Sequence, residues 1–149
     1  MLQIIIKSNT YEGPAVIFPS SLEDSIGSTE SIVVGGWYSI YRSKVGYSVT
    51  VGKKYIAFGV LQVNGETLFL IQNDNNDIIF LPSELAEIME NTLPIGWRIS
   101  DYWNKKIKVL VIGFDYLTES YSNIICMING DKKATEEFLK YKDWVENWL

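Results

Sequence analysis

The dipeptide Asn64-Gly65 stands between two runs rich in β-branched and aromatic residues, Tyr55–Val63 and Glu66–Gln72. Both residues of such a pair readily adopt positive φ angles, which the two-residue turn of a β-hairpin requires. A third apolar run, Ile78–Leu81, follows after a short polar stretch. These runs predict a three-stranded antiparallel meander, so the chain must fold around a sheet.

Other short apolar runs bounded by Gly, Pro and Asn predict further strands. They are Leu2–Ile6, Ala15–Phe18, Ser31–Tyr41, Tyr47–Val51, Trp97–Trp103 and Ile107–Ile112. The pair Gly35-Gly36 inside the third run indicates a bulge or a bend. Strands therefore dominate the first two thirds of the sequence.

Helical spacing appears in three places. Within Pro82–Asn91, Leu85, Ile88 and Met89 stand at i, i+3 and i+4, which predicts a short amphipathic helix. The same spacing recurs nearer the C-terminus, although β-branched residues there would also suit a strand; the residues are Tyr121, Ile124, Ile125 and Ile128. Gly130 is typical of a helix end. A last helix would then bury the stripe Ala134, Phe138, Tyr141, Val145 and Trp148.

The predicted fold class is α+β. A bent antiparallel sheet, or a small barrel-like sheet, would carry a short middle helix and C-terminal helices packed on it. The 149 residues match one domain, residues 1–149, large enough to bury a core without a metal or a disulfide.

The hydropathy pattern argues against a membrane protein. The longest uncharged runs have 11 residues, short of the ~18 that a spanning helix needs. Lys7 interrupts the first apolar run too early for a signal peptide. We expect no membrane association, and the single cysteine favours a cytoplasmic location.

The residue types exclude several classes of enzyme. The chain has no histidine and only one cysteine, Cys126. Imidazole triads and thiolate metal cages are therefore impossible, and the commonest general base is missing. The neighbours of Cys126 are apolar, which raises the pKa of a thiol, so we expect a structural role for it.

One polar stretch has some features of a calcium loop. Asn73, Asn75 and Asp77 alternate, and Glu84 occupies the twelfth position. The sharp turn of such a loop needs Gly at the sixth position, where this sequence has Ile78. A hairpin loop explains these residues better, and we expect neither a metal nor a cofactor.

The net charge of −5 is unevenly distributed. Residues 61–101 carry seven acidic side chains against Arg98 alone, while the flanking segments are close to neutral. Negative surfaces repel nucleic acid and attract basic proteins. We therefore predict a partner-binding surface with Trp103 as an aromatic anchor and with the carboxylates of Asp74, Asp77, Glu84, Glu87 and Glu90. A solvated face that only aids solubility is the plain alternative.

Aromatic and basic residues interleave over 97–106, as they do where proteins stack nucleic-acid bases. The acidic segment before this stretch opposes such binding, and we expect no nucleic-acid partner.

Residues 49–149 resemble small bacterial immunity proteins of polymorphic toxin systems. Three segments carry the resemblance: Val51–Val60, Phe80–Ile88 with the following Leu93–Trp97, and Asn129-Gly130-Asp131 with Ala134, Phe138 and Tyr141. The sequence departs from the family pattern at packing and capping positions, where it has Phe80-Leu81, Ala86 and Lys132. The resemblance brings no catalytic residues with it.

The expected function is that of a non-enzymatic immunity protein. It would bind a cognate toxin domain in the cytosol, a nuclease for example, and block it through the acidic surface. The alternative is a small-ligand or regulatory binding module that uses its aromatic residues. An enzyme built on a pair of carboxylates is a third reading.

Overall fold

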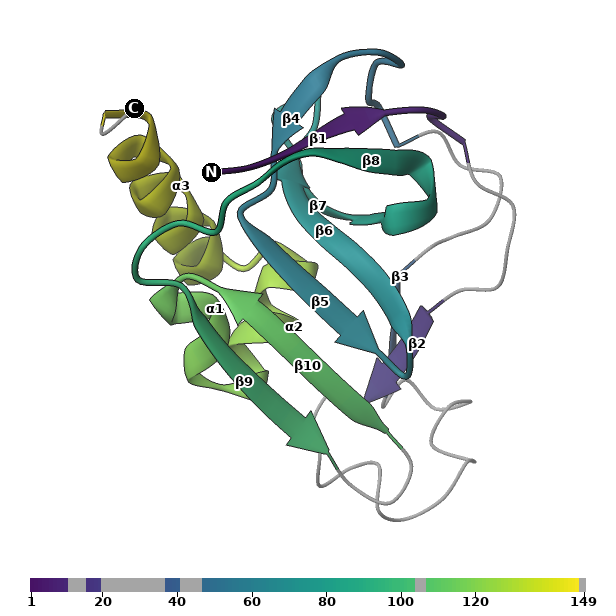
Figure 1. Ribbon diagram of the computed structural model, residues 1–149. Helices are drawn as coiled ribbons and strands as arrows, with labels where there is room; N and C mark the ends of the chain where they lie inside the picture. The colour runs from purple at the N-terminus through teal and green to yellow at the C-terminus, as the bar shows by residue number, and fades with distance from the viewer. Residues whose placement is uncertain (11–15, 20–36, 41–46, 104–106, 148–149) are drawn as a thin grey trace.

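The computed structural model describes residues 1–10, 16–19, 37–40, 47–103 and 107–147. In these ranges the chain forms antiparallel sheets of five and three strands, a two-stranded ribbon and C-terminal helices (Figure 1). The predicted α+β class is confirmed, and the two larger sheets do not close into a barrel. The ribbon pairs β2 (Val16–Pro19) with β3 (Trp37–Ile40). Strand β3 lies within the predicted strand Ser31–Tyr41, and β2 overlaps the predicted strand Ala15–Phe18 but extends one residue beyond it. Gly35-Gly36 lies outside the described residues.

The five-stranded sheet has the strand order β7-β6-β5-β10-β9. Its strands are β5 (Gly59–Val63), β6 (Glu66–Gln72), β7 (Ile78–Pro82), β9 (Arg98–Trp103) and β10 (Lys108–Gly113). The predicted meander is the β5-β6-β7 half. Asn64 and Gly65 form its first turn with φ angles of 48° and 88°, and Val63 lies opposite Glu66. The prediction of a two-residue hairpin is therefore confirmed.

The three-stranded sheet has the order β4-β1-β8, with β1 (Leu2–Ile6) in the centre between β4 (Lys54–Ile56) and β8 (Ala86–Asn91). The predicted strand Tyr55–Val63 is split by a crossing from this sheet to the larger one. The amide of Ala57 donates to the carbonyl of Leu2, and the next amide donates to Leu70 of β6. The predicted strand Tyr47–Val51 is wrong, because these residues form a loop.

The short middle helix is a single 3₁₀ turn, Ser83–Leu85. The prediction that a helix extends over Pro82–Asn91 is wrong, because Ala86–Asn91 pairs with β1 as strand β8. Ala86 and Ile88 lie opposite Ile6 and Ile4, with the alternation of a strand, and the register then shifts at Met89. This irregularity places apolar residues at spacings of three and four, which imitates a helix.

Three helices follow β10: α1 (Asp115–Glu119), α2 (Tyr121–Asn129) and α3 (Lys132–Asn147). Sequence analysis predicts the last two and misses α1. The Ser120 hydroxyl accepts the amide of Asn123 and caps α2, which ends at Gly130 in the left-handed conformation. In α3 the predicted stripe buries Ala134, Phe138 and Val145, whereas Trp148 lies outside the described residues.

Two hydrophobic cores lie on opposite faces of the five-stranded sheet. The helices cover one face, and the three-stranded sheet covers the β6-β7 half of the other. Strand β6 serves both cores, since Leu68 and Leu70 belong to the helical core and Phe69 and Ile71 to the other. This explains why its side chains are almost continuously apolar.

A notch in the sheet positions α1. Gly59 and Gly113 lie opposite each other in β5 and β10, and the side chain of Leu117 fills the space above them. A Cβ atom on Gly59 or Gly113 would lie 2.5 Å or 2.8 Å from the Leu117 Cδ2 atom. The absence of side chains at these two positions therefore lets α1 approach the sheet closely.

Candidate partner-binding site

The five predicted carboxylates lie around the three-stranded sheet and its neighbouring turns. Asp74 and Asp77 belong to the turn between β6 and β7, Glu84 to the 3₁₀ turn, and Glu87 and Glu90 to β8. Trp103 is 68% exposed at the end of β9, which Figure 1 shows at the opposite edge of the molecule from β8. The structure therefore does not bring the predicted anchor together with the predicted acids.

Asp74 has a structural environment of its own. Its carboxylate accepts hydrogen bonds from Lys53 Nζ at 2.8 Å, Thr50 Oγ1 at 2.6 Å and the Tyr55 hydroxyl at 2.7 Å. The bonds from Lys53, Thr50 and Tyr55 lower the pKa of Asp74 from its usual 3.8 to about 2. This carboxylate ties the 47–53 loop to the β6–β7 turn. Most of its hydrogen-bonding capacity and charge is therefore used within the fold and is not offered to a partner.

Two more of the predicted acids have cations beside them. Glu87 lies 3.7 Å from Lys7 Nζ, and Glu90 lies 3.5 Å from the amino group of Met1. Such exposed pairs contribute little stability, yet they reduce the negative potential of the surface. In the folded protein, neighbouring cations thus partly neutralise the acidic excess of residues 61–101.

Asn73 explains the polar stretch that has features of a calcium loop. Its Oδ1 atom accepts the amides of Asn75 and Asp77 at 3.0 Å and 2.9 Å, which closes the β6–β7 turn. Within the described residues no group of three His, Cys, Asp or Glu side chains could hold a metal ion. The polar stretch therefore serves to close the turn, through hydrogen bonds between the Asn73 side chain and backbone amides.

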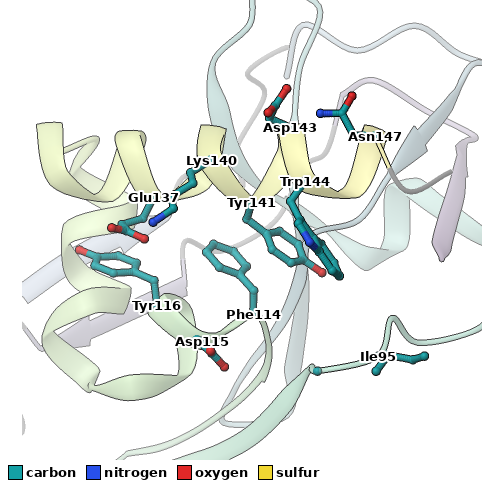
Figure 2. Close-up of a pocket in the computed structure, with 11 residues that line it drawn as sticks. Ile95, Phe114, Asp115, Tyr116, Glu137, Lys140, Tyr141, Asp143, Trp144 and Asn147 are labelled. Carbon is teal, nitrogen blue, oxygen red and sulfur yellow. The ribbon is translucent and has the colours of Figure 1, made fainter.

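A groove with a volume of about 590 Å³ lies between α1, α3 and the segment that enters β9. We call it the α1–α3 groove. Figure 2 shows its aromatic side chains beneath α3, with charged side chains around them. Its lining residues are Ile95, Gly96, Phe114, Asp115, Tyr116, Glu137, Lys140, Tyr141, Asp143, Trp144 and Asn147.

Stacked rings form the floor of the groove. Phe114 and Tyr141 stack with centroids 4.5 Å apart and planes 7° from parallel, and Trp144 continues the row at 5.9 Å and 26°. The Trp97 indole N–H donates to the Tyr141 hydroxyl at 2.6 Å and fixes α3 to the segment before β9. This bond and burial explain why Tyr141 is held in place, and burial raises its pKa.

The open end of the groove is apolar. Trp144 is 46% exposed, and Ile95, on the segment opposite, is 94% exposed. Large apolar side chains that face solvent together are frequent at protein–protein interfaces. Trp and Tyr, which lie at the centre of this groove, are enriched among the residues that dominate binding energy.

Carboxylates surround the rings. Asp115 pairs with Arg98 at 3.1 Å, and Glu137 pairs with Lys133 at 2.8 Å. A second cavity of about 690 Å³ shares Asp115, Tyr116 and Glu137 with the groove. Two lysines line the two cavities together, Lys133 and Lys140, against the carboxylates of Asp115, Glu119, Asp131, Glu137 and Asp143. The helical face is therefore acidic as well as aromatic.

Cys126 lines the second cavity and is partly exposed. Burial, and next the hydrogen bond and charge of Asp131, raise the pKa of its thiol. The predicted direction of this shift is confirmed, although part of the cause is a carboxylate instead of apolar neighbours. A raised pKa leaves the thiol protonated at neutral pH, which is not how a nucleophilic cysteine is prepared.

Sequence analysis missed most of this groove. Tyr141 appears there as part of the core stripe of the last helix and of the family resemblance, never as a binding residue, and Trp144 does not appear at all. Counting charge by segment also hid the groove, because 102–149 is neutral in total. One available signal was the spacing of Glu137, Lys140, Tyr141 and Trp144, which places all four on one side of a helix.

Comparison of the chain with protein-family models, with curated proteins and with solved structures finds no match. None of the helices in the described ranges combines the length and the apolar character needed to cross a lipid bilayer.

Proposed function

We propose that this chain is a non-enzymatic immunity protein that binds a cognate bacterial toxin domain and neutralises it. The observation that carries the proposal is the α1–α3 groove, with aromatic rings on its floor and carboxylates on its rim. Protein-binding hot spots have this arrangement, with aromatic anchors in the centre and polar residues around them. The resemblance of residues 49–149 to immunity proteins of polymorphic toxin systems supports the biological role.

The partner would present a basic surface to the groove. A toxin that cleaves nucleic acid needs positive charge in its substrate cleft, since it must bind phosphates. Asp115, Glu137 and Asp143 would attract that surface during encounter, and Ile95 and Trp144 would be buried on contact. Electrostatic attraction of this kind speeds association and weakens as salt screens the charges.

The test uses the toxin domain encoded by the gene immediately upstream, should one be present, and measures inhibition and binding together. Replacing both Ile95 and Trp144 by Ala should weaken binding by about 30-fold or more, the loss typical of a hot spot. The control variant carries Glu84→Lys and Glu87→Lys, which reverse charge at the three-stranded sheet and should change affinity little. If only the control variant loses binding, the partner uses the β8 surface; if the chain inhibits no such toxin, the proposal fails.

The groove's volume favours a second candidate function, a small-ligand or regulatory binding module. About 590 Å³ falls inside the range of ~300–1,000 Å³ that is usual for small-molecule sites. Native mass spectrometry of the protein purified from its own host would distinguish the two functions. A retained small molecule that disappears in Trp144→Ala would support the ligand-binding module over the immunity protein.

A further inference from the structure

Four strands form the edges of the two larger sheets, and β9 is the edge with the least protection. Strand β4 has only three residues, β8 contains a register shift, and β7 is covered by a core on each face. Short length, bulges and covering layers are ways in which proteins prevent an edge strand from pairing further. Strand β9 has six residues, all paired with β10 in one continuous register.

The outer edge of β9 is open. Figure 1 shows β9 as the outermost strand, and no strand of the described ranges pairs with its outer side. Alternate residues of an antiparallel strand direct their amide and carbonyl groups to opposite sides. About half of the backbone groups of β9 therefore point away from β10. Such a row of unpaired groups is a template for a further strand.

The two faces of β9 carry different side chains. The Tyr102 hydroxyl donates to the carbonyl of Thr118 in α1 at 2.7 Å, so this face of the strand lies toward the helices. Because successive side chains alternate, Ile99, Asp101 and Trp103 lie on the other face. Ile99 is 64% exposed and Trp103 is 68% exposed. The exposed face of β9 therefore presents an acid between two apolar side chains.

Rows of side chains across the sheet indicate what a further strand would present. Ile99 lies opposite Ile112, and Ile112 lies opposite Val60, so an apolar row crosses three strands and ends at β9. Asp101 ends the next row, opposite Leu110, and forms no ion pair with any described residue. Side chains directly opposite each other interact across strands. An added strand would therefore match these rows with an apolar residue and a cation, respectively.

Asp101 also disfavours a second copy of this chain as the added strand. In a symmetric antiparallel pair that places Ile99 opposite Trp103, Asp101 would lie opposite Asp101 of the other copy. Like charges in that position destabilise the pair. Lys108 lies on the same face but opposite Trp103, so it does not occupy the position across from Asp101. The edge therefore suits a different chain that carries a cation.

We propose that the open edge of β9 binds an extended segment of a partner protein as a sixth strand of the sheet. Main-chain hydrogen bonds would provide affinity, and alternate side chains would provide specificity. The segment would place lysine or arginine opposite Asp101 and apolar side chains opposite Ile99 and Trp103. The inference goes beyond the proposed function, because it concerns a second surface and does not require the groove to be occupied.

The experiment uses the full chain and a capped heptapeptide, Thr-Val-Thr-Lys-Thr-Val-Thr. This peptide presents valine, lysine and valine on one face in either strand direction. NMR titration follows the backbone amides of Arg98–Trp103, which the peptide should shift saturably. It should also slow hydrogen exchange of the β9 amides that point away from β10.

N-methylation of the peptide tests whether the main chain carries the binding. One version is methylated at the valines and the lysine, and the other at the two central threonines. Each version loses the amide donors of alternate residues. Because only one of these sets points toward β9, only one version should lose binding.

Charge reversal tests the pairing with Asp101. A peptide with glutamate in place of lysine should bind roughly three- to tenfold more weakly. Asp101→Lys should reverse this preference, so that the glutamate peptide binds more tightly. Glu87→Lys, the same reversal on the edge strand β8, is the matched control and should leave the preference unchanged.

Several outcomes would overturn the inference. They are the absence of a saturable shift in β9, equal effects of the two N-methylated peptides, and a lysine preference that Asp101→Lys leaves intact. Analytical ultracentrifugation of the chain alone should show a monomer. A dimer with protected β9 amides would show that a second copy occupies the edge instead of a partner. None of these results depends on the groove, so the proposed function stands or fails separately.

Discussion

At the scale of the residue, Asp74 shows how a carboxylate predicted to bind a partner can belong to the fold. Its lowered pKa means that the folded state holds the carboxylate ionised more strongly than the unfolded chain does. A group of this kind contributes stability above its unfolded pKa, near 3.8, and the contribution is lost as the pH falls toward about 2.

Asp74→Asn should therefore destabilise the protein at pH 7 and have progressively less effect as the pH falls from about 4 to 2. Urea denaturation followed by tryptophan fluorescence across this range measures the difference between the variant and the parent chain. Asp77→Asn, in the same turn, is the control. A difference between Asp74→Asn and the parent that is constant from pH 7 to pH 2 would contradict the assignment.

The contrast between Asp74 and Trp144 shows what residue-level reasoning could predict. Both residues have polar neighbours in the sequence. Nothing in those neighbours indicates that the Asp74 carboxylate is hydrogen-bonded within the fold or that Trp144 lines a groove. The three donors to Asp74 lie at least 19 positions away along the chain. The surroundings of Trp144 depend likewise on Ile95, brought near by the fold. Pairings across such separations have no local signal.

At the scale of the element, the notch of Gly59 and Gly113 determines where α1 lies. Gly113→Ala would place a methyl group 2.8 Å from the Leu117 side chain and 3.4 Å from two backbone atoms. Overpacking of this kind should destabilise the protein by about 1–3 kcal/mol. Thermal and urea unfolding of the variant would measure the loss.

A second substitution separates overpacking from other causes. Leu117→Ala alone should cost about 2–5 kcal/mol, because it leaves a cavity in the core. Combined with Gly113→Ala it should cost clearly less than the two separate losses added together, since the new methyl group enters that cavity. Simple additivity of the two losses would show that the helix and the glycine pair are not in contact.

Local pattern predicted those elements whose period is regular. Strand β6 and the hairpin turn have alternation and turn residues that agree with each other, and α3 has a stripe over four turns. Pro82–Asn91 misled because the strand β8 contains a register shift, and because pairing with β1 outweighs the weak helical spacing. Ile88 and Met89 are each 52% exposed, whereas the predicted helix would have buried them.

At the scale of the whole molecule, β6 connects the two cores. Its amides between Leu68 and Ile71 can exchange with solvent only when both layers separate from the sheet. Hydrogen exchange should therefore be slowest in β6, at the rate of global unfolding, and faster in β8 at the edge of the three-stranded sheet. Exchange as rapid in β6 as in β8 would show that one layer opens independently.

The double role of β6 has a consequence for how its alignment is maintained. In a strand with one polar face, a register shift of one residue exposes apolar side chains to water and is therefore unfavourable. Here both faces are apolar, so a slip would only exchange leucines with their phenylalanine and isoleucine neighbours. The length of the Asn64-Gly65 turn must then fix the register of β6 against β5. A single residue inserted there would exchange the side chains that β6 contributes to the two cores.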